Sequence, residues 1–541
     1  MKRILLPVLI CAALLVVGFC IGSLIAKSTK KLKDGEHKVI ICATTDVHGA
    51  YFDSTYTGTK NRTSLANVAG YVKQLRDSGE KPVLIDVGDL LQGDLAAYYY
   101  NYVNTKDEHV AISIMKYLGY DALVVGNHDI EAGHSNYDRM LKAFPKKYLA
   151  ANAAASEGPR RGQCYFNKYV VVKRDGIKIG ILGMTNANIK SWLSEDKWSG
   201  MEFFVISNLA EYAVEDMIKR EKPDLVVLAV HSGTGTGFPD IENEAAFLAS
   251  EIPGVDIVLC GHDHKAVAMM IDGVDRPVLL MNEGKGAVVL GQAEVTFHVK
   301  DHKIVNRNIK NRLIPMEDVV PDEGYCKKFS KQFNEVKEYA NRVIGTITGE
   351  MDFSKALDGP SEYINLVQSV QLEASGADIS FTAPLSNRGK IAKGDITFQN
   401  LVDIYKYENQ LYVVKMTGKQ VKDYLEFSYH NWINGTGPAF NYDSADGIIY
   451  EVSRKAPIGS RINIISMRDG SPFDPEKTYD VAMTSYRASG GGDLLKRGAG
   501  INPKDLEIVR KYDDIRNILR DYIEEHKVID PVVPDNWKFV D

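Results

Sequence analysis

The stretch Ala-Leu-Val-Val-Gly-Asn-His-Asp occupies residues 122–129, and Ile-Val-Leu-Cys-Gly-His-Asp-His occupies residues 257–264. In both, a short apolar run typical of a buried strand ends at a glycine, and polar side chains that can bind metals follow at once. Three further apolar runs also lead into polar side chains that can bind metals, in Asp46-Val-His48, in Gly88-Asp89 and in Val230-His231. Because parallel strands deliver their carboxyl ends to one edge of a sheet, we expect these five segments to converge on one cleft.

Between residues 38 and 296 the apolar runs alternate with amphipathic stretches such as Leu65–Arg76 and Leu209–Arg220. This alternation of strand and helix patterns predicts layered α/β structure. Asp175-Gly176 separates two adjacent apolar runs and predicts a β-hairpin, so the sheets should be mixed.

The chain has 541 residues, which is too long for one hydrophobic core and predicts two domains of about 200–300 residues each. A charged stretch without glycine or proline, between Tyr325 and Arg342, predicts a helix that links them. The predicted organisation is a leader at 1–33, a catalytic domain at 34–321, a linker helix at 322–342, a substrate-binding domain at 343–530 and a tail at 531–541.

The N-terminus reads Met-Lys-Arg and continues with an uncharged apolar run from Ile4 to Ala26. Such a run acts as a cleaved signal peptide or as a membrane anchor, because about 20 apolar residues span a bilayer. Cys20 raises the alternative of a lipidated cysteine, although the bulky Phe19 before it does not favour this processing. We therefore expect an exported protein that is periplasmic, on the cell surface or anchored in the membrane.

The composition excludes some classes of partner. Hydrophobic residues make up 45% and charged residues 25% of the chain, which is typical of globular proteins. The net charge is −6 and no basic stretch is interleaved with aromatic residues, which argues against duplex nucleic acid as a partner. A small phosphate ligand held by a few cations is compatible with this charge, and nothing in the composition specifies an oligomeric state.

The residues at the strand ends offer carboxylate oxygens, an amide oxygen and imidazole nitrogens. This mixed set suits Zn²⁺, Mn²⁺ or Fe more than Ca²⁺ or an all-sulfur site. In the Asp-x-His and His-x-His segments, alternate side chains point the same way if the backbone stays extended. The strand ends therefore predict a metal site.

The ordered series of motifs resembles the calcineurin-like metallophosphoesterases, and with the second half of the chain the resemblance narrows to the 5′-nucleotidase family, over residues 38–527. It implies a four-layer α/β/β/α metallophosphoesterase domain with mixed sheets, followed by a separate α+β substrate-binding domain. It also implies two divalent metal ions as cofactors. The implied ligands are Asp46, His48 and His264 for the first metal, Asp89 as the bridge, and Asn127, His231 and His262 for the second.

The resemblance further implies the reaction, which is attack on phosphorus by a metal-bound hydroxide. Two cations about 3.5–4 Å apart suit such an in-line attack. His128 would not be a ligand, but would stabilise the developing charge or protonate the leaving group. Glu131 stands where the family carries an aspartate and would orient His128, while Asn127 would also face the substrate.

Two segments of the second half resemble the nucleoside-binding segments of the 5′-nucleotidase family. They contain Tyr407 and Tyr486, which by this resemblance stack on the two faces of the base. In proteins that bind single-stranded nucleic acid, such stacking is worth about 1–3 kcal/mol per base.

The same domain departs from the family pattern at two places. The loop Thr382–Arg388 replaces a glycine-rich phosphate-side loop, and in it Arg388 alone remains as a phosphate-side cation. The aspartate expected to bind the ribose is displaced by one residue, to Asp493. The substrate could therefore be a phosphate ester other than a nucleotide.

The favoured function is hydrolysis of nucleotide phosphate esters of the 5′-nucleotidase type. A 2′,3′-cyclic-nucleotide 2′-phosphodiesterase with 3′-nucleotidase activity and a UDP-sugar pyrophosphatase are the enzymatic alternatives. A surface nucleotide-binding protein with a residual metal site is the alternative of another class, although such a protein has no need of the bridging Asp89. Because the metals and the tyrosines lie in different predicted domains, we also expect the domains to move during turnover.

Overall fold

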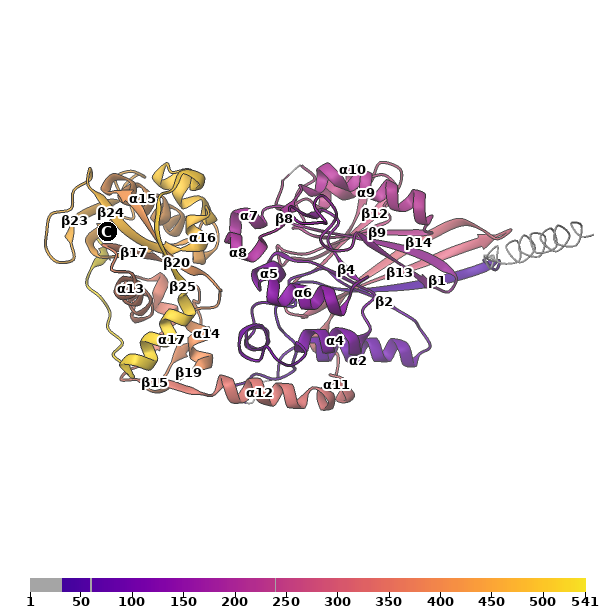
Figure 1. Cartoon of the computed structure of the whole chain (residues 1–541), viewed down its shortest axis with the longest axis horizontal. Coiled ribbons are helices and arrows are strands. Elements are labelled where there is room, and N and C mark those ends of the chain that lie inside the picture. The colour runs from indigo at the N-terminus through magenta and orange to yellow at the C-terminus, as the bar shows by residue number, and fades with distance from the viewer. Residues whose placement is uncertain (1–31, 59–60, 239) are drawn as a thin grey trace, which may run out of the picture.

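The computed structural model describes residues 32–58, 61–238 and 240–541. They form two domains joined by a helical segment (Figure 1). None of the helices in these three ranges is long and apolar enough to cross a membrane. The apolar run Ile4–Ala26, on which the leader prediction depends, lies outside the described residues.

The first domain contains two six-stranded mixed sheets, of which one has the strand order β14-β13-β1-β2-β3-β4. Its strands are β1 (Gly35–Thr44), β2 (Val83–Asp86), β3 (Ala122–Val124), β4 (Tyr148–Leu149), β13 (Val289–Lys300) and β14 (Lys303–Pro315). The run from β1 to β4 is parallel, so the carboxyl ends of β1, β2 and β3 lie at one edge.

The other sheet has the order β11-β12-β10-β9-β7-β6. Its strands are β6 (Tyr169–Arg174), β7 (Ile177–Thr185), β9 (Leu225–His231), β10 (Ile257–Cys260), β11 (Ala266–Asp272) and β12 (Pro277–Glu283). The predicted hairpin is confirmed: β6 and β7 pair antiparallel, and Asp175 and Gly176 both have positive φ, as a type I′ turn requires.

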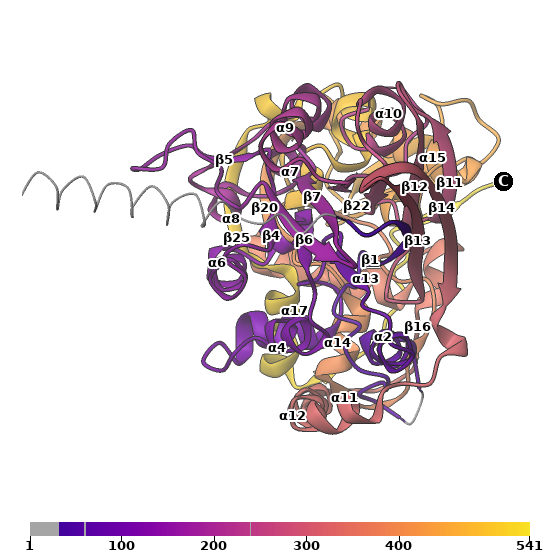
Figure 2. The same cartoon turned by 90° about the vertical axis from the view of Figure 1, so that its right-hand side faces the viewer.

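Four layers result from the alternation of side chains along the strands. In β1, Val39 and Ile41 pack into the core between the two sheets, while Ile40 and Cys42 face the helices. Figure 2 shows α9 and α10 on one side of the sheets and α2 and α4 on the other. These helices are α2 (Leu65–Asp77), α4 (Val110–Leu118), α9 (Ile206–Glu221) and α10 (Ala245–Glu251). The α/β/β/α prediction is confirmed.

The segment between the domains differs from the single predicted helix. It forms two helices, α11 (Glu323–Lys328) and α12 (Ser330–Ala340), which are separated at Phe329. Phe329 is buried, and the Tyr325 hydroxyl donates to the carbonyl of Tyr51 at 2.7 Å. The break allows both helices to pack against the first domain, a tertiary contact that helix propensity does not encode.

The second domain is built around a five-stranded sheet of order β21-β17-β24-β20-β25. The sheet strands and the main helices are β17 (Ile379–Thr382), β20 (Gln410–Thr417), β21 (Ser444–Asp446), β24 (Thr478–Thr484), β25 (Ile508–Asp514), α13 (Glu362–Ser375), α14 (Phe398–Ile404), α15 (Gly418–Asn434) and α17 (Ile515–His526). Residues 531–541, which we predicted as a tail, contribute β27 (Trp537–Phe539), which pairs with β22 (Ile448–Val452). Burial of Trp537 against Tyr450 explains this addition.

Short elements complete both domains. They are β5 (Ala153–Ala155) with β8 (Met201–Phe203), β15 (Val343–Ile347) with β19 (Gly394–Thr397) and β26 (Val528–Ile529), β16 (Met351–Asp352) with β18 (Lys390–Ile391), β23 (Ile462–Met467) beside β22, and the helices α3 (Leu95–Tyr98), α5 (Asn127–Glu131), α6 (His134–Ala143), α7 (Ile189–Trp192), α8 (Glu195–Trp198) and α16 (Ser485–Ala488). In Figure 1, α7 and α8 face α16 and β20 of the second domain.

Candidate metal centre and substrate site

The residues predicted as metal ligands gather in two clusters at the strand ends. Asp46, His48 and His264 form one cluster, and Asp89, His231 and His262 form the other. Within each cluster the potential ligand atoms all lie within 4.8 Å of one another. The structure thus brings together side chains that are up to 218 residues apart, from Asp46 to His264.

In the first cluster, two imidazole rings meet a carboxylate. Nε2 of His48 lies 2.9 Å from Nε2 of His264, and Oδ1 of Asp46 lies 3.4 Å from the same His264 atom. Nδ1 of His48 is 3.2 Å from the carbonyl of Gln92, to which it donates. This bond fixes the tautomer and leaves the Nε2 lone pair facing the cluster, as in a metal-ligating histidine.

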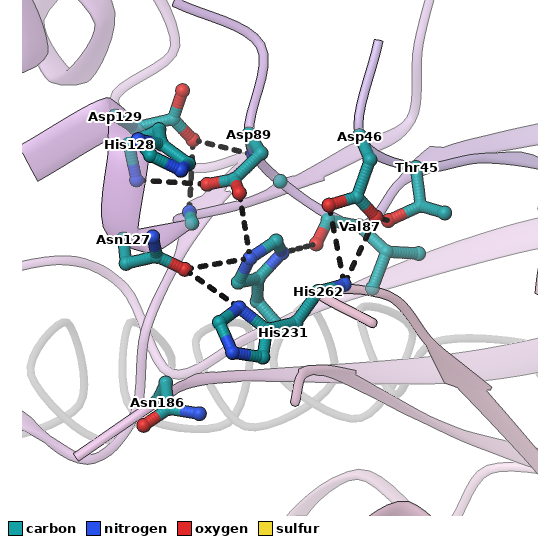
Figure 3. Close-up of polar contacts among 12 residues, drawn as sticks. Thr45, Asp46, Val87, Asp89, Asn127, His128, Asp129, Asn186, His231 and His262 are labelled. Atoms are coloured by element: carbon teal, nitrogen blue, oxygen red, sulfur yellow. Dashed lines mark hydrogen bonds and ion pairs between the residues drawn. The ribbon is translucent and has the colours of Figure 1, made fainter. Parts of the chain in front are cut away.

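In the second cluster, acceptor atoms converge (Figure 3). Nδ1 of His231 donates to the Val87 carbonyl at 2.8 Å, which directs Nε2 toward Oδ2 of Asp89 and Oδ1 of Asn127, both at 3.1 Å. Oδ1 of Asn127 also lies 3.0 Å from Nδ1 of His262. Because Nδ1–H of His231 is engaged by Val87, a neutral ring would turn the Nε2 lone pair toward two oxygens, and a proton or a metal ion at this point removes that repulsion. The donor set therefore fits a divalent cation, and its chemistry suits Zn²⁺, Mn²⁺ or Fe.

The protonation of His231 leads to the same conclusion. Burial lowers the pKa of its imidazole, but the Asp89 carboxylate outweighs burial and raises the pKa to about 9. The cluster thus attracts either a proton or a metal ion. Metal binding would replace that proton, because a ligating imidazole must be neutral at the coordinating nitrogen.

The backbone at these residues is not extended, so the condition under which the alternate side chains of Asp-x-His and His-x-His point the same way is not met. Five predicted ligands have left-handed φ values: Asp46 (49°), His48 (48°), Asp89 (58°), His262 (74°) and His264 (59°). Non-glycine residues in this region are uncommon and are held there by their surroundings. The side chains converge because tight turns follow the strands, and not because the strands continue.

Glycine is required beside the ligands for a steric reason. A Cβ at position 126 would lie 2.1 Å from Oδ1 of Asp89, and a Cβ at position 261 would lie 2.6 Å from Oδ2 of Asp46. Gly126 and Gly261 thus let the neighbouring backbones approach the carboxylates, which explains the glycines of the two most specific motifs.

His128 and Glu131 face each other on α5, three residues apart. Nδ1 of His128 pairs with Oε2 of Glu131, a buried carboxylate. Burial lowers the pKa of His128, yet the charges of Glu131 and Asp89 outweigh it and raise this pKa to about 10. His128 is in neither ligand cluster, and its ring centroid is 5.4 Å from that of His48. The imidazolium therefore lies beside the cluster, where it can act on a bound phosphate.

Of the predicted base-binding tyrosines, Tyr407 lies in the loop between α14 and β20, and Tyr486 lies in the short helix α16. Burial raises the pKa of Tyr407, and the negative charges of Glu131 and Glu408 raise it further. Burial likewise raises the pKa of Tyr486. Glu408, which follows Tyr407 in the chain, accepts a hydrogen bond from Gln92 of the first domain at 3.1 Å, so the loop that carries Tyr407 meets the first domain.

Tyr486 is held by a glycine-rich turn. A Cβ at position 491 would lie 2.4 Å from Cζ of the Tyr486 ring, so the backbone of Gly491 packs on this ring. The guanidinium of Arg487 lies 5.2 Å from the ring centroid. Glycine at 491 is thus explained by the aromatic ring beside it.

Two family models match the chain. The model for the calcineurin-like phosphoesterase matches residues 40–266, and the model for the 5′-nucleotidase C-terminal domain matches residues 343–497. The chain belongs to the 5′-nucleotidase family. The resemblance inferred from the motifs is confirmed, and the protein is a metal-dependent phosphoesterase that, like its family, uses two divalent metal ions.

Relatives that are named for nucleotide hydrolysis are about a quarter identical to this chain over the aligned residues. The trifunctional nucleotide phosphoesterase protein YfkN of Bacillus subtilis (strain 168) is 26% identical over 92% of this chain, but the chain spans only 38% of that protein's length. A 2′,3′-cyclic-nucleotide 2′-phosphodiesterase/3′-nucleotidase of Haemophilus influenzae is also 26% identical, over 92% of this chain and 87% of its own length.

Solved structures share the fold. A Staphylococcus aureus structure assigned as a 5′-nucleotidase, with alpha-ketoglutarate bound, has a TM-score of 0.79 at 20% identity, and covers 93% of this chain and 100% of its own. The 5′-nucleotidase precursor of Thermus thermophilus has a TM-score of 0.67 at 22% identity, with the same coverage. These likenesses support the predicted two-domain fold.

Three residues at the metal centre were not predicted from the sequence. Asp129 accepts the backbone N–H groups of Leu90 (2.9 Å) and Leu91 (3.0 Å), and so anchors the turn after Asp89. It lies in the Gly-Asn-His-Asp motif, which could have revealed it. Glu242 lies 3.1 Å from Nε2 of His262, and Trp192 stacks on that ring at 5.2 Å. Glu242 lies in a loop and Trp192 at the end of the short helix α7, and neither segment carries a local signal.

Two predicted substrate-binding residues, Arg388 and Asp493, make no contact with the metal centre among the residues that the structure describes. Arg388 is exposed, and among the described residues no ion pair or side-chain hydrogen bond of its guanidinium is found. Asp493 is exposed in a left-handed turn with φ of 60°. The phosphate and ribose roles of these residues remain predictions.

Proposed function

We propose that this protein hydrolyses nucleotide phosphate esters, with Tyr407 and Tyr486 holding the base while the phosphate faces the two clusters. One observation carries the proposal, which is that Glu408, the residue after Tyr407, accepts a hydrogen bond at 3.1 Å from Gln92 of the first domain, whose backbone carbonyl in turn accepts the Nδ1–H of His48. A base held at the tyrosines would thereby direct its phosphate toward the centre. The sequence similarity to enzymes named for nucleotide hydrolysis supports this substrate class.

The proposed roles follow from hydrogen-bonding capacity. When bound, two divalent ions supply a water of lowered pKa and neutralise phosphoryl charge. Because Nδ1 of His128 is engaged by Glu131, Nε2–H is the only donor that its ring can offer to a phosphoryl or leaving-group oxygen. The amide oxygen of Asn127 contacts His231 and His262 of the second cluster. These contacts fix the side chain of Asn127 before substrate binds.

A second candidate is hydrolysis of 2′,3′-cyclic nucleotides and 3′-nucleotides. Relatives of that name from Haemophilus influenzae, Yersinia enterocolitica and Salmonella typhimurium are 26%, 24% and 25% identical to this chain. We also propose that the protein is exported, because the uncharged run Ile4–Ala26 follows a basic N-terminus.

Phosphate release tests the proposal. Metal-stripped protein would be supplied in turn with Zn²⁺, Mn²⁺ or Mg²⁺ and offered 5′-, 3′- and 2′,3′-cyclic nucleotides, a UDP-sugar and p-nitrophenyl phosphate. We expect metal-dependent release from nucleotides with kcat/KM well above that for p-nitrophenyl phosphate. Hydrolysis of p-nitrophenyl phosphate without hydrolysis of any nucleotide would refute the substrate class and leave the phosphoesterase chemistry standing.

A further inference from the structure

Glu408 links the two domains through both of its carboxylate oxygens. Oε2 accepts the side-chain N–H of Gln92 in the first domain at 3.1 Å, and Oε1 accepts from Nη1 of Arg516 in the second domain at 2.8 Å. The side chains of Glu408 and Arg516 are only 10% and 1% exposed. A charge-assisted bridge in such a buried place is stronger than an exposed one.

On the second-domain side, the bridge holds the loop that carries Tyr407. Besides pairing with Glu408, Arg516 donates from Nε to the carbonyl of Tyr405 at 2.8 Å and from Nη2 to the carbonyl of Lys406. The backbone N–H of Ile515 donates to the carbonyl of Asn409 at 2.8 Å. The start of α17 therefore fixes this loop, which we call the base loop (residues 405–409), on both sides of Tyr407.

On the first-domain side, the bridge ends at a residue that touches a predicted metal ligand. The backbone carbonyl of Gln92 accepts the Nδ1–H of His48, and its side chain, which is 4% exposed, donates to Glu408. One residue thus connects the first metal cluster to the base loop. The Gln92 side chain can be changed without removing the carbonyl that His48 requires.

We propose that Gln92 and Glu408 are positioning residues, whose bridge sets the distance between the bound base and the reacting phosphate. This inference rests on the proposed hydrolysis of nucleotides. A nucleotide must reach from the base loop to the metals, so the bridge stabilises the arrangement in which a base at Tyr407 presents its phosphate at the centre. A phosphate ester without ribose and base gains nothing from it.

The test compares two single variants, from the two ends of the bridge, with a matched control. Gln92→Met keeps the side-chain volume and the backbone carbonyl but removes the donor. Glu408→Gln keeps the shape but turns an amide N–H₂ toward one of the two donors. Glu350→Gln is the same chemical change in the second domain, at an exposed ion pair with Lys390, and should match the wild type.

Each full-length protein, with both metals confirmed by metal analysis, would be assayed on the best nucleotide and on p-nitrophenyl phosphate. We expect the KM for the nucleotide to rise about tenfold in both bridge variants, which is the effect of losing about 1.4 kcal/mol of binding. The ratio of kcat/KM for the nucleotide to that for p-nitrophenyl phosphate should fall by the same factor. The double variant should be no worse than Glu408→Gln alone, because both changes break one bridge.

Three results would overturn the inference. Equal losses on both substrates would indicate a general structural role, and unchanged nucleotide KM in Gln92→Met would show that the bridge does not position substrate. Loss of a metal ion in Gln92→Met would place the effect at His48 instead. In all three cases wild-type hydrolysis of nucleotides would leave the proposed function intact, whereas its absence would remove both proposals.

Discussion

Arg487 is a buried cation whose removal should strongly destabilise the substrate domain. Its guanidinium is 3% exposed and pairs with both oxygens of Asp443, at 2.9 Å and 2.8 Å. It also donates to Oδ1 of Asn441 at 2.8 Å and to the carbonyl of Gly491 at 3.0 Å. Arg487 thus ties the turn that packs on Tyr486 to the segment around Asp443.

The expected magnitude follows from what Arg487→Met leaves behind. Asp443 is 1% exposed and would keep the Tyr424 hydroxyl but lose its cation. Removing one partner of a buried ion pair costs about 3–5 kcal/mol, because a buried charge is left uncompensated. That is a large part of the about 5–15 kcal/mol that stabilises a typical folded protein. The matched control Lys390→Met breaks an exposed pair and should cost at most about 1 kcal/mol.

Urea unfolding of the full chain, followed by circular dichroism, measures the difference between Arg487→Met and Lys390→Met. We expect the midpoint of the transition to fall strongly for the first variant only. Where the folded variant can be assayed, its KM for a nucleotide should also rise, because Tyr486 loses its support. Equal midpoints for the two variants would refute the reasoning, since the buried pair would then contribute no more than an exposed one.

Two further substitutions test the catalytic and the base-binding roles. His128→Asn should keep both metals, because His128 is in neither ligand cluster. It should lower kcat by about 10²–10⁴-fold, the usual contribution of an acid–base group. Loss of a metal ion in metal analysis of this variant would show that His128 is a ligand. Tyr407→Ala should raise the KM for a nucleotide about tenfold, consistent with about 1–3 kcal/mol of stacking. Tyr407→Phe keeps the ring and should leave the KM unchanged. Equal KM values for the two variants would show that Tyr407 does not stack on the base.

The sequence predicted those parts of the molecule that depend on local pattern. Strand ends marked the ligands, because alternating strand and helix patterns determine which edge of a sheet each motif reaches. The turn at Asp175-Gly176 and the amphipathic stretches Leu65–Arg76 and Leu209–Arg220 were predicted for equally local reasons, and the structure contains this turn and the helices α2 and α9.

The features that sequence reasoning missed depend on contacts between distant segments. Glu242, from a loop, and Trp192, from the helix α7, reach His262 from segments that carry no motif. Trp537 packs on Tyr450 and so makes a strand of the segment that was predicted as a tail. The left-handed backbone at the ligands likewise depends on neighbouring segments of the chain, such as Gly126, which approaches Asp89 closely. No local propensity favours aspartate or histidine in that conformation strongly enough to predict it.

Metal binding should therefore contribute to the stability of the fold. Strained backbone and converging acceptor atoms both cost free energy, and buried carboxylates nearby add to this cost: burial raises the pKa of Asp86 to about 8 and that of Asp129 to about 6. A cation that binds only the folded state stabilises it by about 4.1 kcal/mol when its concentration is a thousandfold above Kd.

Thermal unfolding of metal-stripped protein, repeated with added Zn²⁺ or Mn²⁺, should show a rise in Tm that saturates with the metal. Asp89→Asn should lose most of that rise, because Asp89 is the predicted bridge. A metal-dependent rise of equal size in Asp89→Asn would show that the ions bind elsewhere.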